Sequence, residues 1–182
     1  MTLQYSEENA LRANLLGDIN HAELMHYLDT VGNGSGTKSM AAAAATYRIK
    51  PPLGYIYVVE KLVITLTDNA AFAGNGFGSL SALGNGLLIE IREKPGDSDE
   101  QVIQDITNGV AVKTNAELGA LGELVVAGGA ADCFVQATIK PAGPWRIEGK
   151  RGESLVVQTR ESMAGLAGLY AMAHGRIYTN DV

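Results

Sequence analysis

Histidine, cysteine, serine and acidic side chains are the residues of this sequence that could carry out chemistry. The histidines are His21, His26 and His174. His21 and His26 are five residues apart, whereas the helical zinc motif places its two histidines four apart, on one face. The sequence also contains no His-x-His pair of the kind that a metal site inside a barrel would use. We therefore expect no metal site and no cofactor.

Two patterns could supply a nucleophile. Ser35 and Lys38 have the S-x-x-K spacing, which acts at the start of a helix, but here it lies in a glycine-rich stretch. Cys133 is the single cysteine, so an intrachain disulfide is impossible. It lies in an expected strand with no histidine nearby in sequence, which indicates a small buried apolar group. Neither pattern predicts a catalytic site, and we expect a non-enzymatic protein.

The glycine and carboxylate clusters are also expected to have no catalytic or ligand-binding role. Gly74–Gly78 resembles a phosphate-binding loop, but a strand, not a helix, follows it, so we expect a flexible surface loop. Asp97, Asp99 and Glu100 crowd one turn, where we expect water to solvate them; the glycine and spacing of a calcium-binding loop are missing. Trp145 is expected to be a core or edge anchor, since aromatic residues are only 6% of the chain and a sugar platform would need more.

Composition limits the partners. A chain of 182 residues suits one domain, or one domain with an arm. The net charge is −6 and the densest basic cluster is Lys150-Arg151, so we expect no direct contact with nucleic acid. Charged residues make up only 19% of the chain, and Gly accounts for 22 residues, which predicts a neutral surface of the kind often buried against partners.

The sequence predicts neither a secretory signal nor a membrane-spanning segment. The first residues, MTLQYSEENALRANLL, do not have a basic region followed by an apolar stretch, as a secretory signal would. No window approaches the roughly 18 consecutive apolar residues that span a bilayer. We expect no membrane association, and a protein made and kept in the cytoplasm or released by lysis.

The chain is expected to divide near residue 40 into an N-terminal arm, 1–40, and a β domain, 41–182. The arm has acids after Ser6, a capping-box spacing from Asn20 to Glu23, and the glycine-rich hinge Gly32–Gly36. Tyr27–Asp29 could be helical or a short strand. The leucines that share helical faces in the arm are Leu11, Leu15, Leu16, Leu24 and Leu28.

After Ala45 the helical signals stop and short apolar runs alternate with turns. The expected strands are Thr46–Lys50, Tyr55–Leu66, Leu87–Arg92, Gln101–Ile106, Val110–Lys113, Cys133–Lys140, Trp145–Glu148, Leu155–Thr159 and Leu169–Tyr178. In the second of these strands, Ile56, Val58, Glu60, Leu62, Ile64 and Leu66 are expected to face the core. This pattern predicts an all-β, jelly-roll-like sandwich of about eight strands.

Two glycine-rich stretches are expected to be loops. Asp68–Gly86 carries Phe72, Phe77 and Leu80, and loops of this length tend to be functional or partner-bound. Gly119–Ala131 carries apolar residues that are either exposed or docked on the domain; these are Leu121, Leu124, Val125 and Val126.

Several segments resemble β-rich structural proteins of tailed bacteriophage virions, of the capsid decoration or cement type. They lie in the same order from about residue 27 onward: Tyr27–Asp29, Gly32–Thr37, Pro51–Gly54 leading into Tyr57, Gly84–Gly86, Val112–Ala116, Trp145–Gly149, Gly152–Leu155 and Gly165-Leu166 before a strand ending near Gly175. The chain departs from the pattern in its extension before Tyr27 and in Met163-Ala164, where a pair of acids would be expected.

The resemblance implies a virion component on the outer capsid surface, made in the host bacterial cytoplasm. The expected partners are copies of the chain itself, as a homotrimer, and the major capsid protein. The residues expected to contact partners are Leu11, Leu15, Leu16, Leu24, Leu28, Phe72, Phe77 and Leu80. The alternative is a head-fibre or tail module that binds a host-surface glycan.

Overall fold

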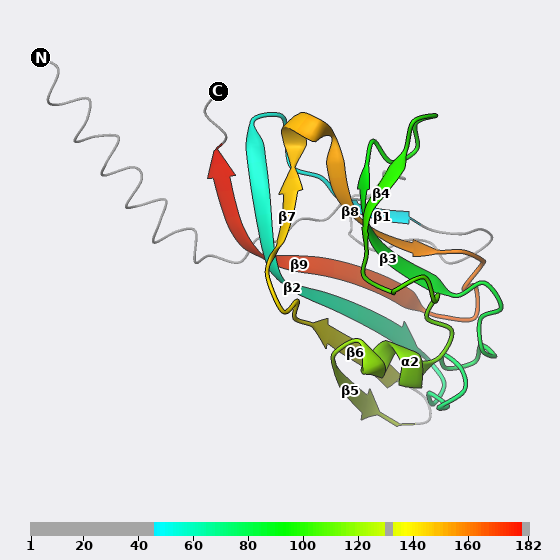
Figure 1. Cartoon of the computed structure of the whole chain (residues 1–182). Helices are drawn as coiled ribbons and strands as arrows, with labels where there is room; N and C mark the ends of the chain where they lie inside the picture. The colour runs from blue at the N-terminus through cyan, green and yellow to red at the C-terminus, as the bar shows by residue number, and fades with distance from the viewer. Residues whose placement is uncertain (1–45, 130–132, 180–182) are drawn as a thin grey trace, which may run out of the picture.

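The computed structural model describes residues 46–129 and 133–179, which form two packed antiparallel sheets (Figure 1). The strands are β1 (Thr46–Ile49), β2 (Tyr55–Asp68), β3 (Leu87–Glu93), β4 (Gln101–Asp105), β5 (Glu123–Gly128), β6 (Cys133–Ile139), β7 (Trp145–Glu148), β8 (Glu153–Thr159) and β9 (Gly168–Thr179). A short helix, α2 (Asn115–Ala120), and a 3-10 turn, η1 (Gly149–Arg151), complete the described elements. The prediction of an all-β sandwich is confirmed.

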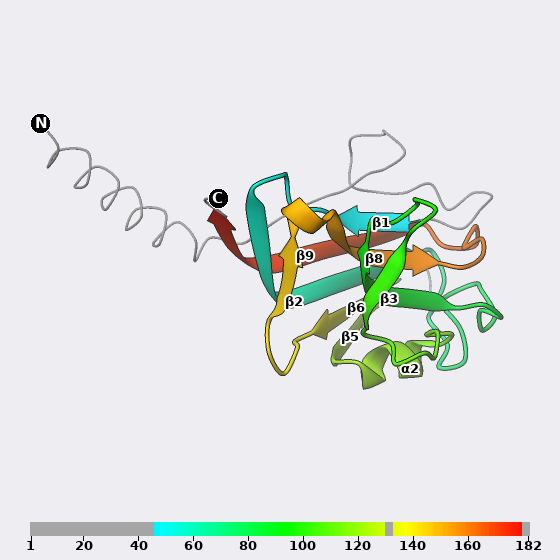
Figure 2. The ribbon, with the colours of Figure 1, turned by 45° about the horizontal axis from the view of Figure 1, so that its top comes forward.

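The two sheets have distinct strand orders. The first has four strands in the order β1-β8-β3-β4, and the second has five, with the order β5-β6-β2-β7 and β9 paired to β2 (Figure 2). The predicted N-terminal arm and hinge lie outside the described residues.

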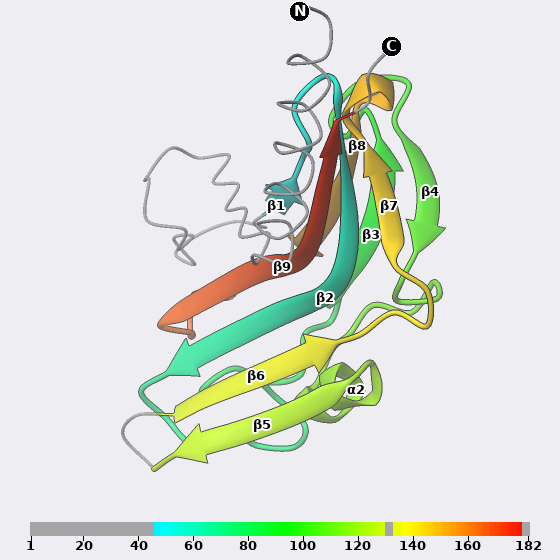
Figure 3. The same ribbon diagram turned by 90° about the vertical axis from the view of Figure 1, so that its left-hand side faces the viewer.

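Strand β2 organises the five-stranded sheet. Its N-terminal part pairs with β7 and its C-terminal part pairs with β6, while β9 runs along both parts on the other side (Figure 3). One strand therefore holds together three neighbours that are distant in sequence. The strand bends between the two parts, and its register with β9 shifts between Val59 and Lys61.

This β-bulge corrects the predicted core face of β2. A bulge places two residues of one strand opposite one residue of its partner, so the side chains beyond it change face. Before the bulge, Tyr57 and Val59 are buried, whereas Val58 is half-buried and Glu60 is exposed. After it, the predicted set is correct: Leu62, Ile64 and Leu66 are all fully buried. Ile56 is also buried, at the start of the strand.

Gly175 of β9 lies opposite the bulge, where it pairs with Val59, and the next pair is Lys61 with His174. A Cβ atom at Gly175 would lie 2.0 Å from the carbonyl oxygen of Val58. The two backbones therefore approach more closely here than any residue with a side chain would allow. The bulge and Gly175 lie where β2 bends. Before the bend β2 pairs with β7, and after it β2 pairs with β6.

Helix α2 and strand β5 were not predicted. The N-cap of α2 is Thr114, whose hydroxyl accepts a hydrogen bond from the Glu117 backbone N–H at 3.2 Å. The Glu117 carboxylate accepts one in return from the Thr114 N–H at 3.0 Å, which completes a capping box. Leu118 of α2 is buried in the core. Of the helices in the described ranges, none has the length and apolar character needed to cross a membrane.

One predicted strand is reduced to a single bridge. Val110–Lys113 makes only an isolated antiparallel bridge, between Val112 and Leu87, because the chain turns into the cap of α2 directly afterwards. Val112 is nevertheless buried and belongs to the core.

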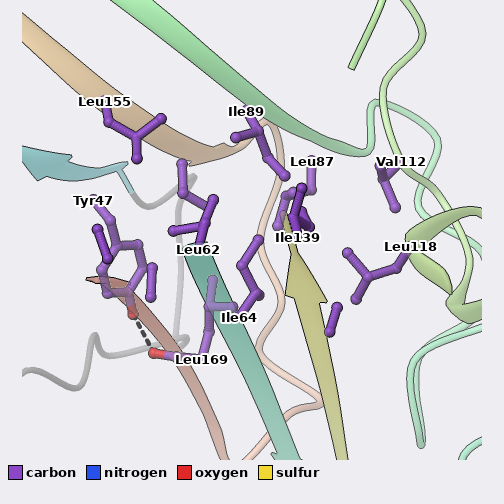
Figure 4. Close-up of a cluster of buried hydrophobic side chains, with 14 of the residues drawn as sticks. Tyr47, Leu62, Ile64, Leu87, Ile89, Val112, Leu118, Ile139, Leu155 and Leu169 are labelled. Carbon is purple, nitrogen blue, oxygen red and sulfur yellow. Dashed lines mark hydrogen bonds between the residues drawn. The ribbon is translucent and has the colours of Figure 1, made fainter. Parts of the chain in front are cut away.

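The core lies between the two sheets and receives side chains from both (Figure 4). The four-stranded sheet contributes Leu87, Ile89 and Leu155, which face Leu62 and Ile64 of β2 in the other sheet. Trp145 is also buried in this core. At one side of the sandwich, the Tyr47 hydroxyl of β1 donates a hydrogen bond to the Leu169 carbonyl of β9, which ties the two sheets together (Figure 4).

Candidate interaction surfaces

The residues that could carry chemistry are dispersed. His21, His26, Ser35 and Lys38 lie outside the described residues. His174 is in β9, and Cys133 is buried at the start of β6. Within 46–129 and 133–179, no three His, Cys, Asp or Glu side chains are placed to hold a metal ion.

The acidic turn between β3 and β4 is more strongly paired than we predicted. Asp99 accepts a hydrogen bond from the Lys94 ammonium, and Glu100 accepts one from Arg92 Nη1 at 2.7 Å. Glu100 also accepts from the backbone N–H of Gly96. Arg92 of β3, Lys94 and the backbone N–H of Gly96, not only water, therefore balance two of the three carboxylates. The hydrogen bond from Lys94 lowers the pKa of Asp99, and Asp99 raises the pKa of Lys94 in return.

Arg92 is the centre of a polar cluster on β3. Its Nε donates to Glu90 at 2.6 Å, its Nη1 to Glu100, and its Nη2 to Gln158 of β8 at 2.9 Å. Ile89 and Ile91 point into the core, so Glu90 and Arg92 lie on the opposite face of the sheet. The planar guanidinium holds three acceptors from two strands and the turn at once. This cluster fixes the turn against the four-stranded sheet.

The long loop after β2, 69–86, carries three of the residues predicted to contact partners. Phe77 is only 1% exposed and belongs to the core, which corrects the prediction that it contacts a partner. The aromatic ring is buried because the loop folds back over the open end of the sandwich. Phe72 and Leu80 are half-buried and pack on the same core. Leu11, Leu15, Leu16, Leu24 and Leu28, the other predicted contact residues, lie outside the described residues.

The loop is fastened at several points. Asp68, the last residue of β2, accepts hydrogen bonds from the backbone N–H of Asn69 and of Ser79, both at 2.7 Å. The Ser79 hydroxyl also donates to the Gly165 carbonyl at 2.6 Å. A Cβ at Gly78 would lie 1.7 Å from the Asp68 carboxylate, so glycine is required for this approach.

Further contacts tie the loop to α2 and to the segment before β9. Asn115 Nδ2 donates to the Ala73 carbonyl at 2.7 Å, and the backbone N–H of Asn85 donates to Glu161 at 2.9 Å. Gly76, in the stretch predicted to be a flexible surface loop, is buried. The loop is therefore a packed part of the domain, and Phe72 and Leu80 are presented on a firm base.

Exposed apolar side chains concentrate on two edge strands. In β4, at one edge of the four-stranded sheet, Val102 and Ile103 are 52% and 44% exposed. In β5, at one edge of the five-stranded sheet, Val125 and Val126 are 45% and 53% exposed. Phe134 of β6, which pairs with Ala127 of β5, is also partly exposed. Exposed β-branched residues on an edge strand are a typical surface for pairing with another chain.

The structure shows which apolar residues of the glycine-rich stretch Gly119–Ala131 are docked on the domain and which are exposed. Leu121 and Leu124 pack against the core, whereas Val125 and Val126 are exposed. Sequence reasoning missed Val102 and Ile103 entirely, because their exposure depends on the position of β4 at the edge of its sheet.

Comparisons with known proteins return no relative. No family model, no curated protein and no solved structure matches this chain.

Proposed function

We propose that this chain is a non-enzymatic structural protein of a bacteriophage virion, a capsid decoration or cement protein that bridges neighbouring capsid subunits. The observation that carries the proposal is the exposure of paired apolar residues on two edge strands, Val102 and Ile103 in β4 and Val125 and Val126 in β5. A protein that acts in isolation gains nothing from such edges, because unpaired edges promote association. A protein that acts by contact uses them.

The composition supports the same proposal. The chain is acidic and has few charges, so its surface is suited to contact with protein and not with the packaged nucleic acid. This favours a position on the outer capsid surface, reached after synthesis in the host cytoplasm. The ordered resemblance of its segments to virion structural proteins supports this position as well.

Repetition explains how small surfaces could hold a shell together. A strand edge buries much less area than the roughly 800 Å² per partner of a standard interface, so each contact is weak alone. On a capsid lattice, a molecule held at one site meets its second site at high effective concentration. Several weak contacts to adjacent subunits then stabilise the shell, and no bond has to be made or broken.

Mass spectrometry of purified virions, from a genome that encodes this sequence, tests the proposal. We expect the chain to be present at a copy number comparable with that of the major capsid protein. A much lower copy number would indicate the neck or tail, and absence from the virion would contradict the proposal. Glycan-array binding by a low-copy protein would support the alternative of a host-binding module.

A binding experiment tests the surface itself. Val102→Lys places a charge on β4, and we expect it to lower the occupancy of capsids assembled without this protein, at equal protein concentration. Leu53→Lys is the matched control, because Leu53 is 79% exposed in the turn between β1 and β2 and is not on an edge strand. Equal occupancy for wild type and Val102→Lys would exclude β4 as a capsid contact.

A further inference from the structure

The edge strands differ in how they are protected against pairing with another chain. Natural edge strands are protected by being short, by bulges, or by charged residues and proline. β1 and β7 have only four residues each, and β7 carries Arg146 and follows Pro144. The register of β4 with β3 shifts between Ile91 and Arg92. β9 is long, but it carries Arg176, and its pairing with β2 shifts register at the bulge.

Strand β5 has neither a bulge nor a proline, and its one charged residue, Glu123, lies at its end. It pairs with β6 in an unbroken register from Glu123 to Gly128, and it contains no lysine, arginine or proline. Among the described strands, it pairs with β6 alone. Its central residues, Leu124, Val125 and Val126, are apolar, two of them are β-branched, and the strand carries one charge, so its free edge can template a further strand. The outward edge of β5 is therefore the described edge best suited to strand addition.

We propose that β5 pairs with β5 of a second copy of this chain, antiparallel and about a twofold axis, so that the two five-stranded sheets become one continuous sheet. A twofold axis perpendicular to the sheet keeps the two outer faces on the same side, so each residue must meet one that points to the same face. The register centred on Val125 satisfies this condition. In it, Val125 lies opposite Val125 of the second copy.

The remaining pairs of this register are also complementary. Leu124 and Val126 lie across from the buried residues Ala137 and Val135 of β6, so both are on the core-side face of the sheet, where Leu124 packs on the core and Val126 stays 53% exposed. In the pair, Leu124 of one copy lies opposite Val126 of the other. Apolar and β-branched cross-strand pairs of this kind stabilise a sheet.

Charge favours a second copy as the occupant. Glu123 is the single charged residue of β5, and in this register it lies opposite Ala127 of the second copy, so the two glutamates do not face each other. The same strand supplies both halves of the contact, as a twofold interface requires. The resemblance implied a trimer; this edge instead supports a dimer. The contact does not depend on a capsid, so it can be tested on the isolated protein.

Sedimentation velocity over a concentration series tests the pairing. We expect the wild-type chain to shift from monomer to dimer as its concentration rises. Val125→Lys brings like charges face to face and should weaken dimerisation by roughly tenfold or more. Val125→Thr keeps a β-branched residue and should dimerise as the wild type does. A wild-type chain that stays monomeric at its highest soluble concentration, or a Val125→Lys variant that dimerises normally, would overturn the proposal.

Cysteine cross-linking tests the register. With a short bis-maleimide reagent, Val125→Cys should give a covalent dimer, and a mixture of Glu123→Cys and Ala127→Cys chains should give the mixed dimer. The wild type is the control for Cys133, which is buried, and Val102→Cys on the bulged edge β4 is the control for random collision. If Val125→Cys cross-links no more than Val102→Cys, the proposed pairing is wrong. Thermal unfolding of each variant verifies that the exposed substitutions leave the fold intact.

Discussion

Asp68 at the end of β2 and Ser79 in the long loop are joined by a hydrogen bond from a backbone N–H to a buried carboxylate. The Ser79 backbone N–H donates to Asp68 Oδ2 at 2.7 Å, while its hydroxyl, 3.1 Å from the same oxygen, donates its one proton to the nearer Gly165 carbonyl at 2.6 Å. Asp68 is the last residue of β2 and is buried, and Ser79 lies in the long loop after β2. The end of the central strand therefore fastens the loop that covers the core. Hydrogen bonds to a charged group are stronger than those between neutral groups, so the contribution of this contact to the free energy of unfolding should be measurable.

Removing that carboxylate should loosen the loop. We expect Asp68→Ala to lower the free energy of unfolding by about 1.5–3 kcal/mol, because the backbone N–H groups of Asn69 and Ser79 lose their hydrogen bonds to a charged group. Amide hydrogen exchange at Ser79 should become faster than in the wild type. Asp97→Ala, the same change at an exposed aspartate in another turn, should alter neither measurement. Unchanged exchange at Ser79 in Asp68→Ala would show that the loop is held by its other contacts.

A methyl group at Gly175, opposite the β2 bulge, should lower the free energy of unfolding. Gly175→Ala would place a Cβ 2.0 Å from the Val58 carbonyl oxygen, so the paired backbones must separate. We expect a loss of stability of about 1–3 kcal/mol in a urea titration, the usual range for an overpacked site. Gly143→Ala is the matched control, since no atom lies within 4 Å of its Cβ. Equal unfolding midpoints for the two variants would show that β9 accommodates the methyl group by shifting.

The bulge in β2 is a feature that the sequence pattern could not predict. The strands could be predicted because apolar residues alternate between turn signals, and this information is local. The core face of β2 changes between Val59 and Lys61, where the strand pairs with Gly175 and His174, and a pairing with residues more than one hundred positions away is not visible in the local pattern. The cap of α2 was a different case. The Thr114 and Glu117 spacing is a local capping signal, but residues 114–118, between the predicted strand Val110–Lys113 and the predicted loop Gly119–Ala131, were assigned to no element, so the helix was missed.

The interaction surfaces were also only partly predictable from local sequence patterns. Phe77 was predicted to contact a partner because it is an aromatic residue in a glycine-rich loop, but the loop folds back and buries it. Val102 and Val125 are exposed because β4 and β5 end their sheets, and strand order is a property of the whole chain. Residue type therefore indicates which side chains are apolar, and topology decides which of them remain exposed.

Arg92 should contribute more to the free energy of unfolding than an ordinary surface arginine. Its side chain is 13% exposed and holds Glu90, Glu100 and Gln158, so Arg92→Met would leave the buried Glu90 without its cation. We expect a loss of about 2–4 kcal/mol in chemical denaturation. Arg146→Met is the control, because Arg146 is 61% exposed in its pair with Glu148 and should contribute at most about 1 kcal/mol. Similar losses for both variants would contradict a special role for the Arg92 cluster.

The pair of Lys94 and Asp99 should be visible in a titration. The hydrogen bond from Lys94 lowers the pKa of Asp99 below its ordinary value. A lowered folded-state pKa means that the carboxylate stabilises the fold above its unfolded-state pKa, and that this contribution is lost as pH falls through the folded-state pKa. In a ¹³C NMR titration, Lys94→Met should raise the Asp99 midpoint, and added salt should raise it in the wild type. A midpoint that does not respond to Lys94→Met would refute the assignment.

The hydrogen bond between the sheets is the contact most easily isolated from packing. Tyr47 is buried, and its hydroxyl donates to the Leu169 carbonyl across the sandwich. Tyr47→Phe keeps the ring in the core and removes only the hydroxyl, which leaves a buried carbonyl short of a donor. We expect a loss of about 1–2 kcal/mol, measured as a lower urea midpoint with an unchanged slope. Tyr55→Phe removes an exposed hydroxyl and should have no effect. A Tyr47→Phe variant as stable as the wild type would mean that packing alone aligns the two sheets at this side.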